Sequence, residues 1–142
     1  MKTRFIELDF MKCDEVEEVI NLEYEVLGAS PFVAISMLPF KKRVIVAKVD
    51  DNIVGCATVC WKNKFEIASL VVRKEHRKKG IGSAIIKKCV EIAKELGFST
   101  IWLETPENGP IEFYKIHGFY IDSFVKNMYG ENLSGIKMIK HI

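Results

Sequence analysis

A basic run that leads into two closely spaced glycines is the segment of this sequence best suited to bind a ligand. The run places six basic side chains within seven residues: Arg73, Lys74, His76, Arg77, Lys78 and Lys79. Gly80 and Gly82 follow, and apolar side chains then recur at helical spacing through residues 81–96. The first turn of a helix offers unpaired backbone N–H groups and positive partial charge, and glycine lets a ligand approach them. Because Ser83 adds a hydroxyl, the segment predicts a diphosphate-binding site.

Two common nucleotide-binding motifs fit this segment poorly. A P-loop needs the pattern GxxxxGK[ST], which the sequence lacks. A dinucleotide-binding turn needs GxGxxG, but Ile85 stands at the third glycine position and a charged loop separates the preceding strand from Gly80. Glu104 does lie about twenty residues further on, where that motif carries an acid for the ribose. The dinucleotide alternative therefore rests on one matching acid.

Length and composition predict one compact domain over residues 1–142. Of the 142 residues, 49% are hydrophobic, and the net charge of +2 is too small by itself to indicate a nucleic-acid-binding protein. No apolar run is long enough to span a membrane, and the N-terminus lacks the apolar core of a signal peptide, so we expect a cytoplasmic location and no membrane contact. We expect no metal site and reduced thiols, because no CxxC pair occurs among the four cysteines: Cys13, Cys56, Cys60 and Cys89.

Strand-like and helix-like segments alternate along the chain. Strands are expected at residues 3–8, 65–72 and 99–104, and two hairpins at 43–61, around Asp50-Asp51-Asn52, and at 119–142. Helices are expected at residues 14–27, 81–96 and 110–118, each ended by a glycine or followed closely by one, while the apolar segment 29–40 is ambiguous. The expected order, β-α-α-β-β-β-α-β-α-β-β, predicts an α/β (α+β) fold with one mostly antiparallel mixed sheet and helices on both faces.

Two motifs in this order resemble those of the GNAT family of N-acetyltransferases. Residues 77–82, RKKGIG, match the family signature [R/Q]xxGx[G/A] within a similar strand, loop and helix, and PIEFYKIHGF resembles the second motif with Tyr114. The resemblance covers essentially the whole chain and implies a single acetyl-CoA-dependent N-acetyltransferase domain. Within the family, NLEYEVLGASPF, TIWLET and NMYGENLSGIKM are most similar to the N-terminal alanine acetyltransferases of ribosomal proteins.

The resemblance implies which groups bind acetyl-CoA. Backbone groups of Leu70, Val71 and Val72 are expected to pair with the pantetheine arm. The diphosphate is expected to bind the loop and helix start: Arg77, Lys78, Lys79, Gly80, Ile81, Gly82 and Ser83. The family often has an asparagine seven residues before the tyrosine, whereas here Asn108 lies six before Tyr114 and Glu107 occupies the usual place. This departure leaves the contact expected from Asn108 with the cofactor open.

The same resemblance implies catalytic roles for three side chains. Tyr114 is placed like the family's general acid, because a phenol with an ordinary pKa of about 10 holds a proton that it can give to the departing thiolate. Glu104 corresponds to the glutamate treated as the base in the ribosomal-protein enzymes, and Glu66 to the catalytic glutamate of the histone-type enzymes. Structural roles remain as alternatives: helix packing for Tyr114, the strand end for Glu104 and a solvated strand position for Glu66.

The expected acceptor is an amine, either the N-terminus of a peptide or a small molecule. Tyr129 is a candidate to bind a peptide backbone, with packing as the alternative, and Cys60 is not expected to carry an acyl group because no partner histidine lies nearby in the sequence. A rival interpretation makes the basic loop an RNA-binding surface, with Phe119, Tyr120 and Phe124 stacking on bases. The glycine pair opening a helix argues against this rival, so no nucleic acid is expected.

Overall fold

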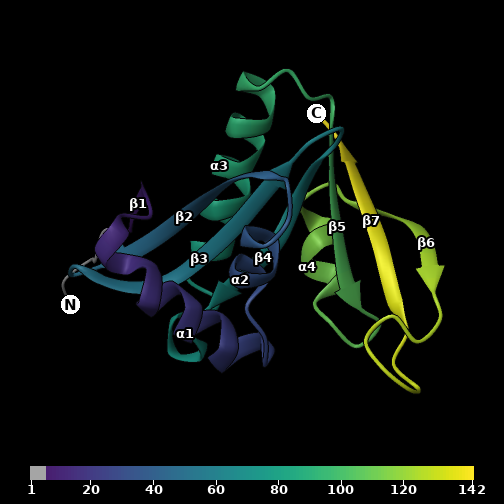
Figure 1. Cartoon of the computed structure of the whole chain (residues 1–142), viewed down its shortest axis with the longest axis horizontal. Coiled ribbons are helices and arrows are strands. Elements are labelled where there is room, and N and C mark those ends of the chain that lie inside the picture. Colours follow the sequence, from purple (N-terminus) through teal and green to yellow (C-terminus); the bar gives the residue numbers. More distant parts are fainter. Residues whose placement is uncertain (1–5) are drawn as a thin grey trace.

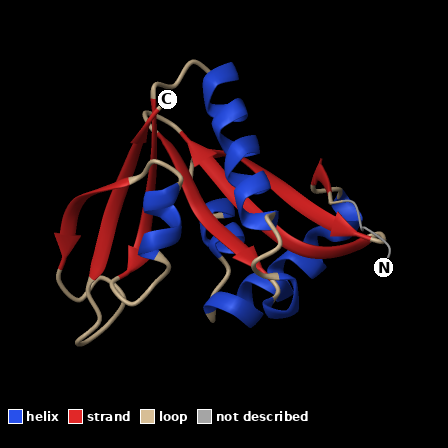
Figure 2. Ribbon diagram, turned by 180° about the vertical axis from the view of Figure 1, so that it is seen from behind, coloured by secondary structure: helices blue, strands red, loops and turns tan. Residues whose placement is uncertain are grey.

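The computed structural model describes residues 6–142, which form a seven-stranded sheet with helices on both faces (Figures 1 and 2). The strands are β1 (Glu7–Phe10), β2 (Lys41–Val49), β3 (Asn52–Trp61), β4 (Phe65–Val72), β5 (Thr100–Pro106), β6 (Tyr120–Val125) and β7 (Gly135–His141). The helices are α1 (Val16–Leu27), α2 (Pro31–Ser36), α3 (Ile81–Glu95) and α4 (Ile111–Ile116), with 3-10 turns at Cys13–Glu15 and Lys74–His76. This order confirms the expected one, although the expected first strand, 3–8, lies partly outside the described residues.

The sheet has the order β1-β2-β3-β4-β5-β7-β6, and its pairs are antiparallel except for β4 with β5. These two parallel strands pair only from Phe65 opposite Ile101 to Ile67 opposite Leu103. Both strands then continue, β4 to Val72 and β5 to Pro106. Figure 1 shows the two groups of strands separating toward the bottom of the view, so the sheet opens between β4 and β5.

Local sequence explains where the expected hairpin turns and helices begin and end. Asp50 and Asp51 both have positive φ, 52° and 65°, as a two-residue type I′ turn between β2 and β3 requires. The ambiguous segment 29–40 contains α2, whose N-cap Ser30 accepts a hydrogen bond from the Val33 N–H at 3.2 Å. Gly28, with φ of 75°, ends α1.

Two apolar clusters lie on opposite faces of the sheet. The larger one joins β2–β5 and β7 to α3 and α4, and it includes Phe65, Ile67, Ile85 and Leu103. The smaller one lies under α1 and consists of Val19, Leu22, Val44, Val46, Ile53, Cys56 and Val71. Figures 1 and 2 show α1 and α2 on one side of the sheet and α3 and α4 on the other.

A β-bulge in β4 changes which of its side chains face α1. Thr58 pairs with Ser69 but Val59 pairs with Ile67, so Ala68 is an extra residue on β4. Phe65 and Ile67, before the bulge, belong to the cluster under α3, whereas Val71, two residues beyond Ser69, belongs to the cluster under α1. Strand alternation therefore places Glu66, Ser69 and Val71 on the α1 face.

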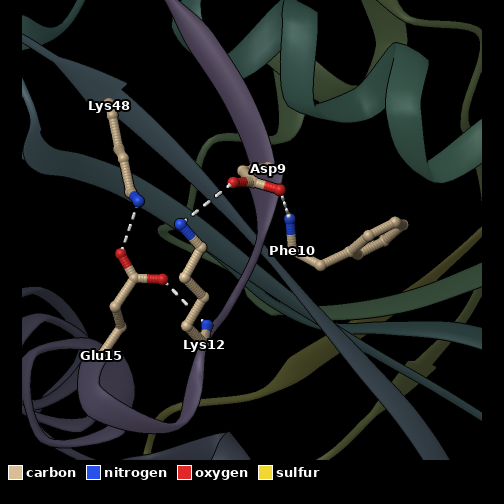
Figure 3. Close-up of polar contacts among 5 residues, drawn as sticks. All are labelled: Asp9, Phe10, Lys12, Glu15 and Lys48. Atoms are coloured by element: carbon tan, nitrogen blue, oxygen red, sulfur yellow. Dashed lines mark hydrogen bonds and ion pairs between the residues drawn. The ribbon is translucent and has the colours of Figure 1, made fainter.

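An ion pair attaches the start of α1 to β2 (Figure 3). Lys48 Nζ on β2 lies 2.6 Å from Glu15 Oε2, and both side chains are largely shielded, with exposed fractions of 14% and 13%. The other oxygen, Glu15 Oε1, accepts from the Lys12 backbone N–H at 2.8 Å. The hydrogen bond from Lys48 lowers the pKa of the Glu15 carboxyl and raises the pKa of the Lys48 ammonium.

No helix in the described residues is long and apolar enough to cross a membrane.

Candidate functional site

The opening between β4 and β5 leaves a strand edge available to an extended ligand. From Ala68 onward β4 pairs with β3, but no pairing of β4 with β5 occurs in the described residues beyond Ile67 and Leu103. Backbone N–H and C=O groups left unpaired at such an edge need another partner. Leu70, Val71 and Val72, expected from the sequence to bind the pantetheine arm, all lie on this part of β4.

The two glycines at the start of α3 are required for different reasons. Gly80 has a φ of 82° as the N-cap, which is the left-handed region, and a Cβ there would meet no atom within 4 Å. At Gly82 a Cβ would come within 3.0 Å of Phe113 Cζ. Gly80 thus permits the turn, and Gly82 permits α4 to pack closely on the first turn of α3, a reason that the sequence did not indicate. The Ile81 side chain is buried in the core.

Part of the basic run holds the loop to the sheet. Arg77 Nε donates to the Val72 carbonyl oxygen at 3.0 Å, Arg73 Nε donates to the Ile53 carbonyl oxygen at 3.2 Å, and Arg73 Nη1 pairs with Glu25 Oε2 at 2.6 Å. Lys78 and Lys79 are exposed and form no ion pair among residues 6–142. These two lysines provide exposed positive charge beside the α3 N-terminus.

A histidine that sequence reasoning missed lies at the same helix start. Ser83 Oγ and His117 Nε2 are 3.0 Å apart, and the His117 ring lies 4.7 Å from that of Phe113. Lys140 Nζ donates to the His117 carbonyl oxygen at 2.8 Å and so attaches the end of α4 to β7. The contact between Ser83 and His117 joins residues that are 34 positions apart, so no local sequence pattern predicts it.

Tyr114 on α4 has its ring in the core. It is 7% exposed and makes edge-on contacts with Phe113 and Phe119, with centroid distances of 5.4 and 5.8 Å. Its hydroxyl has no hydrogen-bond partner among the described residues. Burial, reinforced by neighbouring Cys89 and Tyr129, raises the pKa of Tyr114 to about 12. The phenol therefore stays protonated at neutral pH.

The position of Phe119 contradicts one part of the RNA-binding alternative. Phe119 is 2% exposed and packs against Tyr114, so its ring is not available to stack on a nucleic-acid base. In the RNA-binding alternative, Phe119 stacks on a base together with Tyr120 and Phe124. Phe119 is buried in the core beside Tyr114 of α4, whereas Tyr120 and Phe124 are exposed.

Two glutamates share the α1 side of the opening, and Tyr129 from the loop between β6 and β7 lies near them. Strand alternation places Glu66 and Glu104 on the same face, since Ile101 and Leu103 belong to the opposite cluster. Burial raises the pKa of the Glu66 carboxyl, and the charge of Glu104 raises it further. Burial, Glu104 and Glu66, in that order, raise the pKa of Tyr129 to about 12. The three groups are therefore close enough to influence one another, as sequence alone did not reveal.

The surroundings of these glutamates differ. Glu104 is exposed, and Lys137 Nζ lies 4.0 Å from its Oε1, at the limit of an ion pair. Glu66 is opposite Cys60 across β3 and β4. Burial and Glu66 raise the pKa of the Cys60 thiol to about 11, and the residue is 1% exposed, which disfavours a thiolate nucleophile. In the described residues no group of three or more His, Cys, Asp or Glu is arranged for a metal.

Asn108 lies in the exposed loop between β5 and α4. Its neighbour Glu107 attaches this loop to the one between β6 and β7. The Glu107 backbone N–H donates to the Ser134 carbonyl oxygen at 2.9 Å, and Glu107 Oε1 accepts from the Ser134 N–H at 3.4 Å. The residue at the family's usual asparagine position thus has a structural partner, and the contact expected from Asn108 stays a prediction.

A buried glutamate on α1 was also missed. Glu23 is 0% exposed, although it lies in a helix whose apolar spacing accommodates either Leu22 or Glu23 in the core. Its carboxylate accepts hydrogen bonds from α2, β3 and β4. The only local feature that could have indicated this burial was the position of a glutamate on the apolar face of an amphipathic helix.

Comparison with known proteins identifies relatives of different acceptor types. Streptothricin acetyltransferase A from Bacillus subtilis is 30% identical over 92 residues, which cover 62% of this chain and 53% of that protein. The chain thus spans about half the length of this curated relative. The structure of a streptothricin acetyltransferase from Bacillus anthracis, described as putative and in complex with acetyl coenzyme A, is 27% identical, with a TM-score of 0.67 and coverage of 71% and 62%.

The ribosomal-protein-S18-alanine N-acetyltransferase of Escherichia coli has a TM-score of 0.83 and covers 97% of this chain and 94% of that one, with 14% identity. That likeness concerns the fold. By their names these relatives act on different acceptors, so the comparisons do not single out the ribosomal-protein subgroup. The model of the Acetyltransferase (GNAT) family matches residues 13–119, which is three quarters of the chain, and the chain therefore belongs to the GNAT family of acetyltransferases.

Proposed function

We propose that this protein transfers the acetyl group of acetyl-CoA directly to an amine. The observation that carries the proposal is the opening between β4 and β5, which has the start of α3 close to β4 and Tyr114 on the adjoining helix α4. An extended arm requires an unpaired strand edge, and a diphosphate requires free N–H groups at a helix start. Membership of the GNAT family supports the same assignment.

The loop before α3 fits a diphosphate. The Ala84 N–H makes the first helical bond, to Gly80 O at 3.0 Å, so the N–H groups just before it are available to a ligand. Exposed Lys78 and Lys79 add positive charge, and Arg77 binds the Val72 carbonyl to hold the loop against β4. Leu70, Val71 and Val72 on β4 then bind the pantetheine arm through their backbone.

The transfer forms one carbon–nitrogen bond and breaks one carbon–sulfur bond. A neutral amine attacks the thioester carbonyl, its excess proton passes to a base, and the departing sulfur takes a proton from an acid. Tyr114 is the acid, because a phenol with a pKa of about 12 keeps its proton at neutral pH and its hydroxyl is not engaged by another protein group in the described residues. A backbone N–H of β4 polarises the carbonyl.

Glu104 is the base in this proposal. It is exposed on the α1 face of the opening, so solvent or an acceptor amine can reach it directly or through a water. Glu66 lies on the same face, and in its ionised form it attracts the ammonium form of the acceptor to the opening. The opposite assignment, with Glu66 as the base, predicts that alkaline pH restores the activity of Glu66→Gln and not that of Glu104→Gln.

The acceptor is a cationic amine, and we place the N-terminus of a peptide first. Glu66, Glu104 and Tyr129 provide two carboxylates and a phenol at one place, which favours an ammonium group over an anion. A small-molecule amine is the second candidate, because the relative with 30% identity is named a streptothricin acetyltransferase. Exposed Tyr129 is positioned to contact either acceptor.

Two measurements test the function. Native mass spectrometry of the purified protein should detect bound CoA, whereas co-purifying nucleic acid would support the RNA-binding rival. A thiol-release assay with acetyl-CoA should then be run over peptides with different N-terminal residues, free amino acids and polyamines. Thiol release that requires one acceptor class identifies the substrate. Absence of CoA binding by the folded protein contradicts the proposal.

A further inference from the structure

The buried carboxylate of Glu23 contacts the segment that leads into α2. Glu23 Oε1 accepts from Ser30 Oγ at 2.7 Å and from the Phe32 N–H at 3.0 Å. Ser30 Oγ also accepts from the Val33 N–H at 3.2 Å, so the Ser30 hydroxyl proton is directed to Glu23. One carboxylate oxygen thus holds the N-cap and the first turn of α2 to α1.

The other oxygen of the same carboxylate contacts the sheet at the bulge. Glu23 Oε2 accepts from Ser69 Oγ on β4 and from Thr58 Oγ1 on β3, the latter at 3.0 Å. Ser69 Oγ in turn accepts from the Thr58 N–H at 3.1 Å. Ser69 directly follows the extra residue Ala68, and without that bulge its side chain would face α3 instead of Glu23.

The pattern of donors suits an ionised carboxylate. The Phe32 N–H can only donate, and the oxygens of Ser30 and Ser69 already accept from backbone N–H groups, so both hydroxyls donate to Glu23. No ion pair of Glu23 with a basic side chain is present in residues 6–142. The negative charge of Glu23 also contributes, after burial, to the raised pKa of the neighbouring Cys56 thiol.

A buried charge without a cation is costly to maintain where a leucine or methionine could fill similar volume. Its four donors come from α2, β3 and β4, and α2 packs against both strands. In Figure 1, α2 lies in front of β4 beside the opening. The carboxylate therefore connects α2, beside the opening, to the β4 edge.

We propose that Glu23 is a positioning residue that sets α2 and the β4 bulge in one arrangement for acetyl transfer. The inference rests on the proposed function. The Oε1 side, through Ser30, positions the wall of the acceptor site. The Oε2 side, through Ser69, positions the backbone of β4 next to the residues that hold the thioester. The two hydroxyls should consequently affect different kinetic constants.

The test compares Ser30→Ala, Ser69→Ala and Glu23→Gln, with Cys56→Ala as the matched control. Cys56 is 0% exposed in the same α1 cluster, so its truncation weakens packing without removing a hydrogen bond to Glu23. Kinetics are measured with acetyl-CoA and either an alanine-initiated peptide or spermidine, whichever is acetylated. Thermal unfolding is recorded for every variant.

Ser69→Ala should lower kcat about tenfold to a hundredfold with little change in acceptor KM, because displacement of a reacting group by about 1 Å costs that much. Ser30→Ala should mainly raise acceptor KM, and Glu23→Gln should change both constants. Cys56→Ala should lower Tm with kcat and KM near wild type. If the serine variants change only Tm, as the control does, Glu23 has no positioning role.

Amide hydrogen exchange tests the connection without any activity. Glu23→Gln should speed exchange at Phe32 and at Thr58 together, since both amides depend on this cluster. Exchange that rises at only one of the two contradicts the connection, and the serine variants give the same comparison if the Gln variant does not fold. If the wild-type protein acetylates no acceptor, the proposed function is wrong, and so is the kinetic role of Glu23. The exchange result still decides whether Glu23 connects α2 to the strands.

Discussion

Gly82 on α3 lies directly against the ring of Phe113 on α4, where a Cβ would come within 3.0 Å of Phe113 Cζ. Phe113 precedes Tyr114, so this contact joins the proposed diphosphate site to the helix that carries the proposed acid. The same helix start includes the Ser83 and His117 contact. Substitutions at Gly82 therefore test both ligand approach and helix packing, and the two effects can be separated.

Gly82→Glu should weaken acetyl-CoA binding by more than about tenfold, which corresponds to about 1.4 kcal/mol, because it adds negative charge where the diphosphate binds. Lys78→Ala should have a much smaller effect, since the contacts are mainly with backbone groups. Gly82→Ala separates the causes: it displaces Phe113 slightly but adds no charge. Isothermal titration calorimetry measures all three. Equal affinity of Gly82→Glu and Lys78→Ala contradicts the assignment of this helix start.

Tyr114→Phe removes only a hydroxyl and should lower kcat by about a hundredfold or more, the usual contribution of a general acid. Affinity for acetyl-CoA should change little, because the ring and its contacts with Phe113 and Phe119 remain. Tyr120→Phe on β6 is the control, since it removes a hydroxyl that is hydrogen-bonded to His141 on β7. Steady-state kinetics and calorimetry give the two quantities. A wild-type rate for Tyr114→Phe would leave Tyr114 with packing alone.

The pKa of Tyr114, about 12, also predicts the alkaline side of the pH profile. Because burial raises this pKa, the phenol keeps its proton well above the pH at which an ordinary tyrosine, with a pKa of about 10, ionises. The rate should therefore show no loss from tyrosine ionisation between about pH 7 and 10. A tyrosinate absorbance band that appears near pH 10 can be assigned with the Tyr114→Phe variant. Its disappearance in that variant contradicts the raised pKa.

Glu104→Gln should lower turnover most near neutral pH, with recovery at alkaline pH as the acceptor amine loses its own proton. Glu66→Gln should show a smaller loss that does not depend on pH. Glutamine keeps the size of the side chain and part of its hydrogen bonding, so packing changes are small. The profile of kcat/KM against pH is the measurement. Alkaline rescue in Glu66→Gln alone assigns the base to Glu66, and rescue in neither variant assigns proton transfer to water.

Glu15→Gln should lower Tm at neutral pH, and its difference from wild type should shrink in acid. Lys48 holds the folded-state pKa of Glu15 below its unfolded value of 4.5. The contribution of Glu15 is therefore complete above about pH 4.5 and is lost as pH falls through the folded pKa. Thermal unfolding from pH 3 to 8 provides the test, with exposed Glu131→Gln as the control. A difference in Tm that stays constant down to pH 3 contradicts this contribution.

Local sequence determined most of the elements and the ends of several. The Asp50-Asp51 turn, the start of α3 at Gly80 and the end of α1 at Gly28 each depend on a few neighbouring residues with a required φ. Apolar spacing likewise predicted α1 and α3, because their buried faces repeat at the helical period. Segment 29–40 was ambiguous, since a six-residue helix is too short to show such a period.

Tertiary structure decided the order of strands and the composition of the candidate site. β7 lies between β5 and β6, and the parallel pairing of β4 with β5 stops at Ile67 and Leu103, which no local pattern specifies. The approach of Glu66 to Glu104 follows from that pairing, and the contact of Glu23 with Ser69 follows from one extra residue in β4. Chain segments far apart in sequence meet only when the sheet and its two cores assemble, because burial and hydrogen bonding then reward contacts that local propensity cannot encode.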